Sequence, residues 1–241
     1  MCTVTYIPDE KGDFVFTSSR DESPLRSTIS PALYEEEGTA LLYPKDTVAG
    51  GSWIMLSEQY RLVCLMNGMD TNSNKTYSKS RGVFVKNIAL STALFEDLNH
   101  IDFSDYAPFT CVVLDWSSAI FGVEIVWDGR LLQKQELDNT PRIWSSSSLY
   151  SNLVRKEREV WFESWMSEQY IAKGTSVLSF HDNTRKGTSE TAIRMKRSRV
   201  ETVSISSIVK QGEDVSMEYF DLLSSEQTKA SFESELDAVI V

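Results

Sequence analysis

The chain has 241 residues, a length that suits one sizeable domain. Hydrophobic residues make up 41% and aromatic residues 11%, which is enough apolar material for a packed core and excludes wholesale disorder. The formal net charge of -11 argues against a protein whose main function is binding nucleic acid, because phosphate contacts need clustered Lys and Arg.

Neither a membrane span nor a secretion signal is indicated. No run of about 18 apolar residues occurs, which is the length that a membrane-spanning helix requires. Charged residues interrupt the N-terminus almost at once, at Asp9, Glu10, Lys11 and Asp13, so it lacks the apolar segment of a signal peptide. We therefore expect a cytoplasmic protein.

The cysteines and histidines do not form a metal-binding pattern. Cys2, Cys64 and Cys111 are widely separated and odd in number, as expected of free thiols in a reducing compartment. Only His100 and His181 could add imidazole ligands, and no spacing matches a zinc motif. We expect no metal and no cofactor. We also expect Cys64 and Cys111, which lie in apolar segments, to be inert packing residues.

The first half of the chain is predicted to be mainly strands. β-Branched and aromatic residues predict an opening hairpin of strands 3–7 and 14–17 around a turn at 8–13. The polar cluster at 18–22 is expected to end the second strand, and residues 23–39 are expected to be irregular. Further strands are predicted at 40–43, 52–56 and 62–66, then a surface loop at 70–80 and helices at 83–90 and 92–100.

The second half alternates in the same way. Strands are predicted at 109–115, 121–127 and 130–137, the last two joined through Asp128-Gly129. The serine run 145–148 is expected to be a loop with a helix N-cap before an amphipathic helix at 152–167. Late strands are predicted at 191–196, 202–209 and 216–222. The whole order predicts an α+β fold of largely antiparallel sheets covered by helices, as one domain over 1–223. The acidic, serine-rich tail 224–241 is expected to be a short helix or a frayed end.

Cys2 is a candidate nucleophile because it directly follows the initiator methionine. Removal of Met1 would leave a free α-amino group, whose reference pKa of about 8 lies close to that of a thiol. That group can carry the proton of its own side chain, so no Cys-His pair is required. The alternative is that a small residue at position 2 has no catalytic meaning, and on position alone this alternative is favoured.

The predicted hairpin returns Arg20 and Asp21 to the neighbourhood of residue 2. A guanidinium near a thiol favours the thiolate, and a carboxylate can hold an α-ammonium group. The competing interpretation of these residues is a solvated turn.

The order Met1-Cys2-Thr3, strand, turn, second strand and Asp21 resembles the start of the penicillin V acylase and bile-salt hydrolase group of N-terminal-nucleophile (Ntn) hydrolases. In that group, a cysteine, an arginine and an aspartate of the returning strand form the catalytic cluster. Asp21 falls at the family spacing from Cys2, whereas Arg20 is displaced from the position of the family arginine.

The sequence is more similar to the NRDE, or transport and Golgi organisation, family. The Asn-Arg-Asp-Glu motif of that family corresponds to residues 19–22, where Ser19 replaces the asparagine. Similar blocks follow in order at 49–53, 62–68, 80–82, 144–146, 149–150 and 202–205. The resemblance implies a four-layer αββα Ntn-hydrolase-like fold.

Further candidates lie between these blocks. Asn67 ends an apolar strand before Gly68, and its amide could donate to an oxyanion; a turn-forming Asn-Gly pair is the alternative. Gly51 would let a ligand approach the backbone, Trp53 could contact it, and Arg81 could meet an anionic group. A bend, a core residue and a surface arginine are the respective alternatives.

Two functions remain open. The first is a cysteine amidohydrolase that acts on linear amide or related acyl bonds, with Cys2, Arg20, Asp21 and Asn67 as its catalytic residues and a small acyl or amide compound as its ligand. The second is a catalytically silent carrier of a hydrophobic ligand, such as haem or an acyl lipid, because a fold alone does not confer activity.

Overall fold

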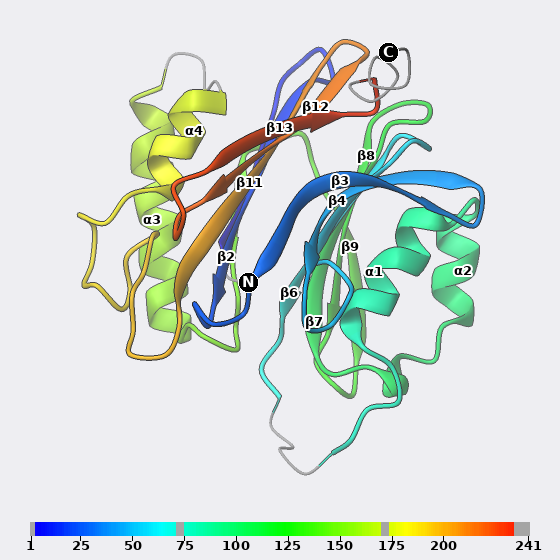
Figure 1. Ribbon diagram of the computed structural model, residues 1–241, viewed down its shortest axis with the longest axis horizontal. Coiled ribbons are helices and arrows are strands. Elements are labelled where there is room, and N and C mark those ends of the chain that lie inside the picture. Colours follow the sequence, from blue (N-terminus) through cyan, green and yellow to red (C-terminus); the bar gives the residue numbers. More distant parts are fainter. Residues whose placement is uncertain (1–2, 71–74, 170–173, 234–241) are drawn as a thin grey trace. The chain divides into compact units, whose positions relative to one another are not determined.

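The computed structural model describes residues 3–70, 75–169 and 174–233. The chain divides into two compact units, one of Met1–Ser27 with Asn139–Val241 and one of Thr28–Asp138. Each unit is built on one antiparallel sheet with its own helices (Figure 1). Among the described residues, no helix is both long and apolar enough to span a membrane. The expectation of one domain over 1–223 remains a prediction.

The first unit contains a six-stranded sheet in the order β10-β1-β2-β11-β12-β13. The strands are β1 (Thr3–Pro8), β2 (Phe14–Glu22), β10 (Arg142–Ser145), β11 (Glu201–Gln211), β12 (Asp214–Asp221) and β13 (Gln227–Ser231). Helices α3 (Asn152–Ser167) and α4 (Gly174–His181) lie on one side of it (Figure 1). The chain therefore places its N-terminal hairpin between two strands, β10 and β11, that come from the second half of the sequence.

Strand alternation decides which side chains of this sheet meet the helices. Ile7 and Val15 are a cross-strand pair, and both pack with Phe162 of α3 and Phe180 of α4. Residues on the same face of the hairpin, two and four positions away along each strand, therefore also point toward the helices. Ser19 and Thr5 belong to this helix-side face, whereas Ser18 and Arg20 belong to the opposite face.

The second unit contains a seven-stranded sheet in the sequential order β3 to β9. Its strands are β3 (Thr28–Glu36), β4 (Thr39–Asp46), β5 (Ile54–Ser57), β6 (Arg61–Asn67), β7 (Phe109–Asp115), β8 (Phe121–Trp127) and β9 (Leu132–Glu136). Helices α1 (Arg81–Leu90) and α2 (Leu94–His100) and the 3-10 turn η1 (Phe103–Asp105) follow β6. Phe84 of α1 packs against Phe109 of β7 with ring centroids 4.6 Å apart, which joins helix and sheet in one core.

Most predicted elements are confirmed, but the end of the first hairpin is not as expected. The polar run 18–22 does not terminate β2, which continues to Glu22 with Ser18, Ser19, Arg20 and Asp21 all buried. The run stays in the sheet because β1 and β11 both pair with it. Residues 23–39 are also not irregular throughout, since Thr28–Glu36 forms β3 against β4.

The second half of the chain holds the other differences. No strand forms at 191–196, where Ile193 packs into the helix-side core. Residues 227–231 of the tail form β13 rather than a helix or a frayed end, while 234–241 lie outside the described residues. Strand β10 and helix α4 were not predicted. The N-cap of α3 is Ser151, whose side chain accepts from the backbone N–H of Val154, rather than a residue of the run 145–148.

Candidate active site

Arg20 and Asp21 are adjacent in β2 and are each only 3% exposed. As neighbours in a strand they point to opposite faces of the sheet. Asp21 lies on the helix-side face, in register with Thr202, and Arg20 lies on the other, in register with Ser204. Cys2 lies outside the described residues. Its covalent neighbour Thr3 is paired with Ser19, so Arg20 is the next residue along β2.

The Asp21 carboxylate is held by two hydroxyl donors from distant parts of the chain. The Tyr150 hydroxyl donates to Oδ2 and the Thr202 hydroxyl to Oδ1, each at 2.6 Å. Thr202 Oγ1 in turn accepts from the backbone N–H of Met195 at 2.9 Å. A buried carboxylate needs such donors to offset its lost hydration, and two short bonds also fix its orientation.

Tyr150 is itself positioned by a buried cation. The guanidinium carbon of Arg158, on α3, lies 3.7 Å from the centroid of the Tyr150 ring, within the range of a cation–π interaction. Arg158 is completely buried and donates to the Thr3 hydroxyl at 2.6 Å. It also donates to the carbonyls of Thr191 and Ala192. One side chain thus supports both Tyr150 and the first described residue of β1.

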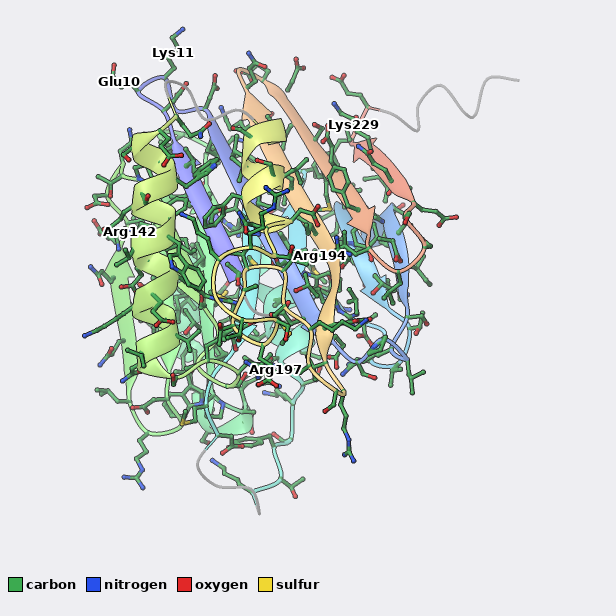
Figure 2. All side chains as sticks on the ribbon, turned by 90° about the vertical axis from the view of Figure 1, so that its left-hand side faces the viewer. Glu10, Lys11, Arg142, Arg194, Arg197 and Lys229 are labelled. Atoms are coloured by element: carbon green, nitrogen blue, oxygen red, sulfur yellow. The ribbon has the colours of Figure 1, made fainter. Side chains whose placement is uncertain are left out.

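A second arginine lies close to the Tyr150 ring. Arg197, labelled in Figure 2, has its guanidinium carbon 5.2 Å from the centroid of the same Tyr150 ring. It also donates to the carbonyls of Leu149 and Glu190 at 3.0 Å and 3.1 Å. Arg197 thus ties its own segment to Leu149, the residue before Tyr150.

His181, the last residue of α4, joins the helix to the sheet. Its Nδ1 lies 2.8 Å from Ser19 Oγ and its Nε2 lies 2.9 Å from Thr5 Oγ1. Burial, with a further contribution from the charge of Arg158, lowers the pKa of His181 to about 3, so the ring is neutral near pH 7. A neutral imidazole has one N–H and one acceptor nitrogen, and the two hydroxyls can satisfy both. Ser19, which replaces the asparagine of the family motif, is thus a hydrogen-bond partner of His181.

The second unit brings together the other predicted residues around the end of β6. The backbone N–H of Gly68, directly after Asn67, donates to the Pro108 carbonyl at 2.9 Å. Arg81, the first residue of α1, donates to the same carbonyl at 3.2 Å. Asn67 and Arg81 are therefore held near one carbonyl.

Gly51 and Trp53 lie beside that group. A Cβ built on Gly51 would be 3.5 Å from the Cα of Gly82, an ordinary van der Waals distance, so the segment before β5 lies against the start of α1. Trp53 is only 6% exposed, and its carbonyl accepts from the backbone N–H of Leu65 at 2.8 Å. The packing favours the core interpretation of Trp53 over a ligand platform.

Cys64 and Cys111 are fully buried free thiols, as predicted for packing residues. Burial, with a smaller effect of Cys64, raises the pKa of the Cys111 thiol well above its ordinary value. Neither is suited to act as a nucleophile, because the thiolate is the reactive form. Within the described ranges, no group of three or more His, Cys, Asp or Glu side chains could hold a metal ion.

Comparison with known families decides the relationship. The sequence matches the family described as Transport and Golgi organisation 2 over residues 1–239. The chain belongs to this family. No curated protein matches the sequence. The family membership confirms the resemblance seen in the blocks along the sequence.

Solved structures show the fold of this Transport and Golgi organisation 2 family member. An orthologue of the N-acylethanolamine-hydrolyzing acid amidase from Caenorhabditis elegans is similar with a TM-score of 0.53 and 13% identity, over 86% of this chain and 92% of that one. A variant of the conjugated bile acid hydrolase of Clostridium perfringens gives 0.54 and 10%, over 97% and 93%. At these identities the likeness establishes the fold alone. The predicted α+β, Ntn-hydrolase-like fold class is confirmed.

Proposed function

We propose that this protein is an Ntn cysteine hydrolase that cleaves linear amide or related acyl bonds, with Cys2 as its nucleophile after removal of Met1. The observation that carries the proposal is the Asp21 carboxylate. This carboxylate is buried and is oriented by two hydroxyl donors. It belongs to β2, which pairs with β1, and β1 begins at Thr3, the residue after Cys2. A carboxylate so fixed is suited to hold an α-ammonium group.

The proposed reaction uses the thiol and the amine of one residue. The Cys2 sulfur attacks the carbonyl carbon while the α-amino group takes the thiol proton. Collapse of the tetrahedral intermediate breaks the C–N bond, and the α-ammonium gives its proton to the leaving amine. Water, deprotonated by the α-amino group, then attacks the thioester, releases the acid and restores the thiol.

The remaining roles follow from residue chemistry. Arg20 would favour the thiolate, and Asp21 would hold the α-ammonium form. The Asn67 amide would donate to the oxyanion. Gly51 and Arg81 are proposed to contact the substrate, and Trp53 to support them. The roles of these second-unit residues rest on their chemistry and on the family resemblance.

Alkylation of the native protein tests the nucleophile directly, since Cys64 and Cys111 are buried. Intact mass should show loss of Met1, and iodoacetamide near pH 7 should label one cysteine at least tenfold faster than a model thiol. Cys2→Ala should abolish the labelling. Retention of Met1 in normally processed protein, or labelling of Cys2 at the rate of a model thiol, would refute the mechanism.

Hydrolysis tests the reaction class. The amidase similarity suggests N-acylethanolamines as the first substrates to assay. Wild-type protein should release ethanolamine from N-octanoylethanolamine and the Cys2→Ala variant should not. Equal release by both proteins would refute the proposal. Binding without turnover in both would favour the carrier function instead.

A further inference from the structure

Three buried serines, Ser18, Ser204 and Ser206, form a block on the face of the first unit's sheet that carries Arg20. Ser18 is the register partner of Ser206, and Arg20 is the register partner of Ser204, so the four side chains form a square across β2 and β11. Partners across the strands have Cβ atoms about 5 Å apart, and same-face neighbours along a strand lie about 7 Å apart. In the proposed function, this is the face from which Arg20 would favour the Cys2 thiolate.

The hydroxyl oxygens of this serine block are all without a hydrogen-bond partner among the residues that the structure describes. All three side chains are completely buried, at 0% exposure. The same two strands show that such hydroxyls can pair, because Thr17 and Ser207, cross-strand partners on the helix-side face, have their oxygens 3.0 Å apart. A buried hydroxyl that stays unpaired costs stability, so three of them side by side call for a functional explanation.

The serine block is confined to one end of the face. Two positions farther from Arg20 along the same strands, the face is apolar, with Phe16 and Ile208 as register partners that are both completely buried. Apolar side chains at positions 18, 204 and 206 would have extended this core without leaving polar groups unpaired. The hydroxyls are therefore concentrated where the face approaches the start of β1.

The charges beside the serine block favour a neutral ligand. Arg20 supplies a cation and donates to the carbonyl of Arg26 at 3.1 Å. Asp221 of β12, the register partner of Ser204, supplies a carboxylate, which accepts from the backbone N–H of Leu223 at 2.8 Å. A charged ligand would meet one charge of each sign here. A serine hydroxyl donates one hydrogen bond and accepts others, so it suits hydroxyl groups of a ligand, which do the same.

We propose that the serine block binds hydroxyl groups on the acyl part of the substrate, so that the preferred substrates are amides of neutral, hydroxylated acids. The inference rests on the proposed hydrolase function. An acyl group attached at the start of β1 must cross two strand spacings, roughly 10 Å, to reach β11. A chain of about six carbons, at about 1.5 Å per bond, spans that distance together with one hydrogen bond of about 2.8 Å.

Two ethanolamides with six-carbon acyl chains test this assignment. N-gluconoylethanolamine carries hydroxyls along that chain, and N-hexanoylethanolamine carries none. Wild-type protein should have a kcat/KM at least tenfold higher for the gluconoyl compound. Ser206→Ala should lower this ratio about threefold to tenfold, the effect of one neutral hydrogen bond. Ser207→Ala is the matched control, because Ser207 is the adjacent buried serine on the opposite face of β11; it should keep the wild-type ratio.

Two kinetic outcomes overturn the assignment. One is a wild-type protein that prefers the hexanoyl compound or does not distinguish the two. The other is a Ser206→Ala protein with the wild-type ratio, which would mean that the hydroxyls bind water only. If Ser206→Ala fails to fold, as judged by circular dichroism, Ser18→Ala removes the cross-strand hydroxyl of the same block and should give the same fall in the ratio.

A binding measurement separates this inference from the proposed function. Calorimetric titration of N-gluconoylethanolamine into Cys2→Ala protein needs no turnover, and adding Ser206→Ala should weaken the binding about threefold to tenfold. If wild-type protein hydrolyses neither ethanolamide but this binding behaves as predicted, the serine-block assignment stands and the hydrolase proposal fails. If wild-type protein hydrolyses N-hexanoylethanolamine but the Cys2→Ala protein does not bind the gluconoyl compound, the serine-block assignment fails alone.

Discussion

The buried imidazole of His181 should make the stability of this protein depend on pH. Its pKa in the folded state is about 3, against an ordinary value of 6.5. Below pH 6.5, His181 is protonated in the unfolded chain but stays neutral in the folded protein. The stability that His181 contributes is therefore fully present above pH 6.5 and is lost progressively as the pH falls to about 3. Each pKa unit corresponds to about 1.4 kcal/mol, so the loss between pH 7 and pH 5 is roughly 2 kcal/mol.

Urea unfolding at pH 7 and pH 5 measures this loss, because most carboxylates stay ionised in that window. His181→Gln should reduce the pH dependence by about 2 kcal/mol and should lower stability at pH 7 by about 1–3 kcal/mol, since Ser19 and Thr5 lose a buried partner. The chain has only two histidines, so His100→Gln is the matched control. It replaces an exposed ring and leaves the contacts of His181 with Ser19 and Thr5 in place, so the wild-type pH dependence should remain. An unchanged pH dependence in His181→Gln would refute the reasoning.

Four further substitutions test packing and hydrogen bonding within the two units, each by urea unfolding. Tyr150→Phe keeps the ring but removes the donor to Asp21, and it should cost about 1.5–3 kcal/mol and slow alkylation of Cys2; an unaltered alkylation rate would argue against a role for that bond. Gly68→Ala should cost at least about 1–3 kcal/mol, since its Cβ would lie 2.7 Å from backbone atoms, and full stability would contradict that contact. Ser206→Ala should be neutral or stabilising by about 1 kcal/mol, because the buried Ser206 hydroxyl has no partner among the described residues. Ser207→Ala should destabilise by a similar amount, since its hydroxyl bonds Thr17, and the reverse order of these two variants would refute the assignment.

Much of the fold could be predicted from local signals. Strands β7 and β8 were predicted with their observed bounds, because apolar alternation and the Asp128-Gly129 turn are features of the segment itself. The errors arose where distant residues decide the outcome. The run 18–22 has the composition of a turn, yet Ser19 is buried because His181 bonds it from 162 positions away. Local composition cannot contain that partner.

The same limit applies to the candidate site. Asp21 was identified from its spacing to Cys2, but Tyr150, Thr202 and Arg158, which orient it, were not. Each is 129 or more positions from its partner in the hairpin, and none has a motif of its own. Tyr150 and Thr202 did fall in blocks that resemble the family. A role could have been suspected for them there, although their contact with Asp21 could not.

The structure also changes how the Ser-Arg-Asp-Glu segment is understood. In the sequence, Arg20 and Asp21 form a single charged cluster, but as adjacent strand residues they serve opposite faces of the sheet. Asp21 is bound into the helix-side network through Tyr150 and Thr202, whereas Arg20 on the other face donates to the carbonyl of Arg26 at 3.1 Å. The proposed nucleophile needs one group that holds its α-ammonium form and another that stabilises its thiolate. In the proposed mechanism, Asp21 would hold the α-ammonium group from one face of the sheet and Arg20 would favour the thiolate from the other.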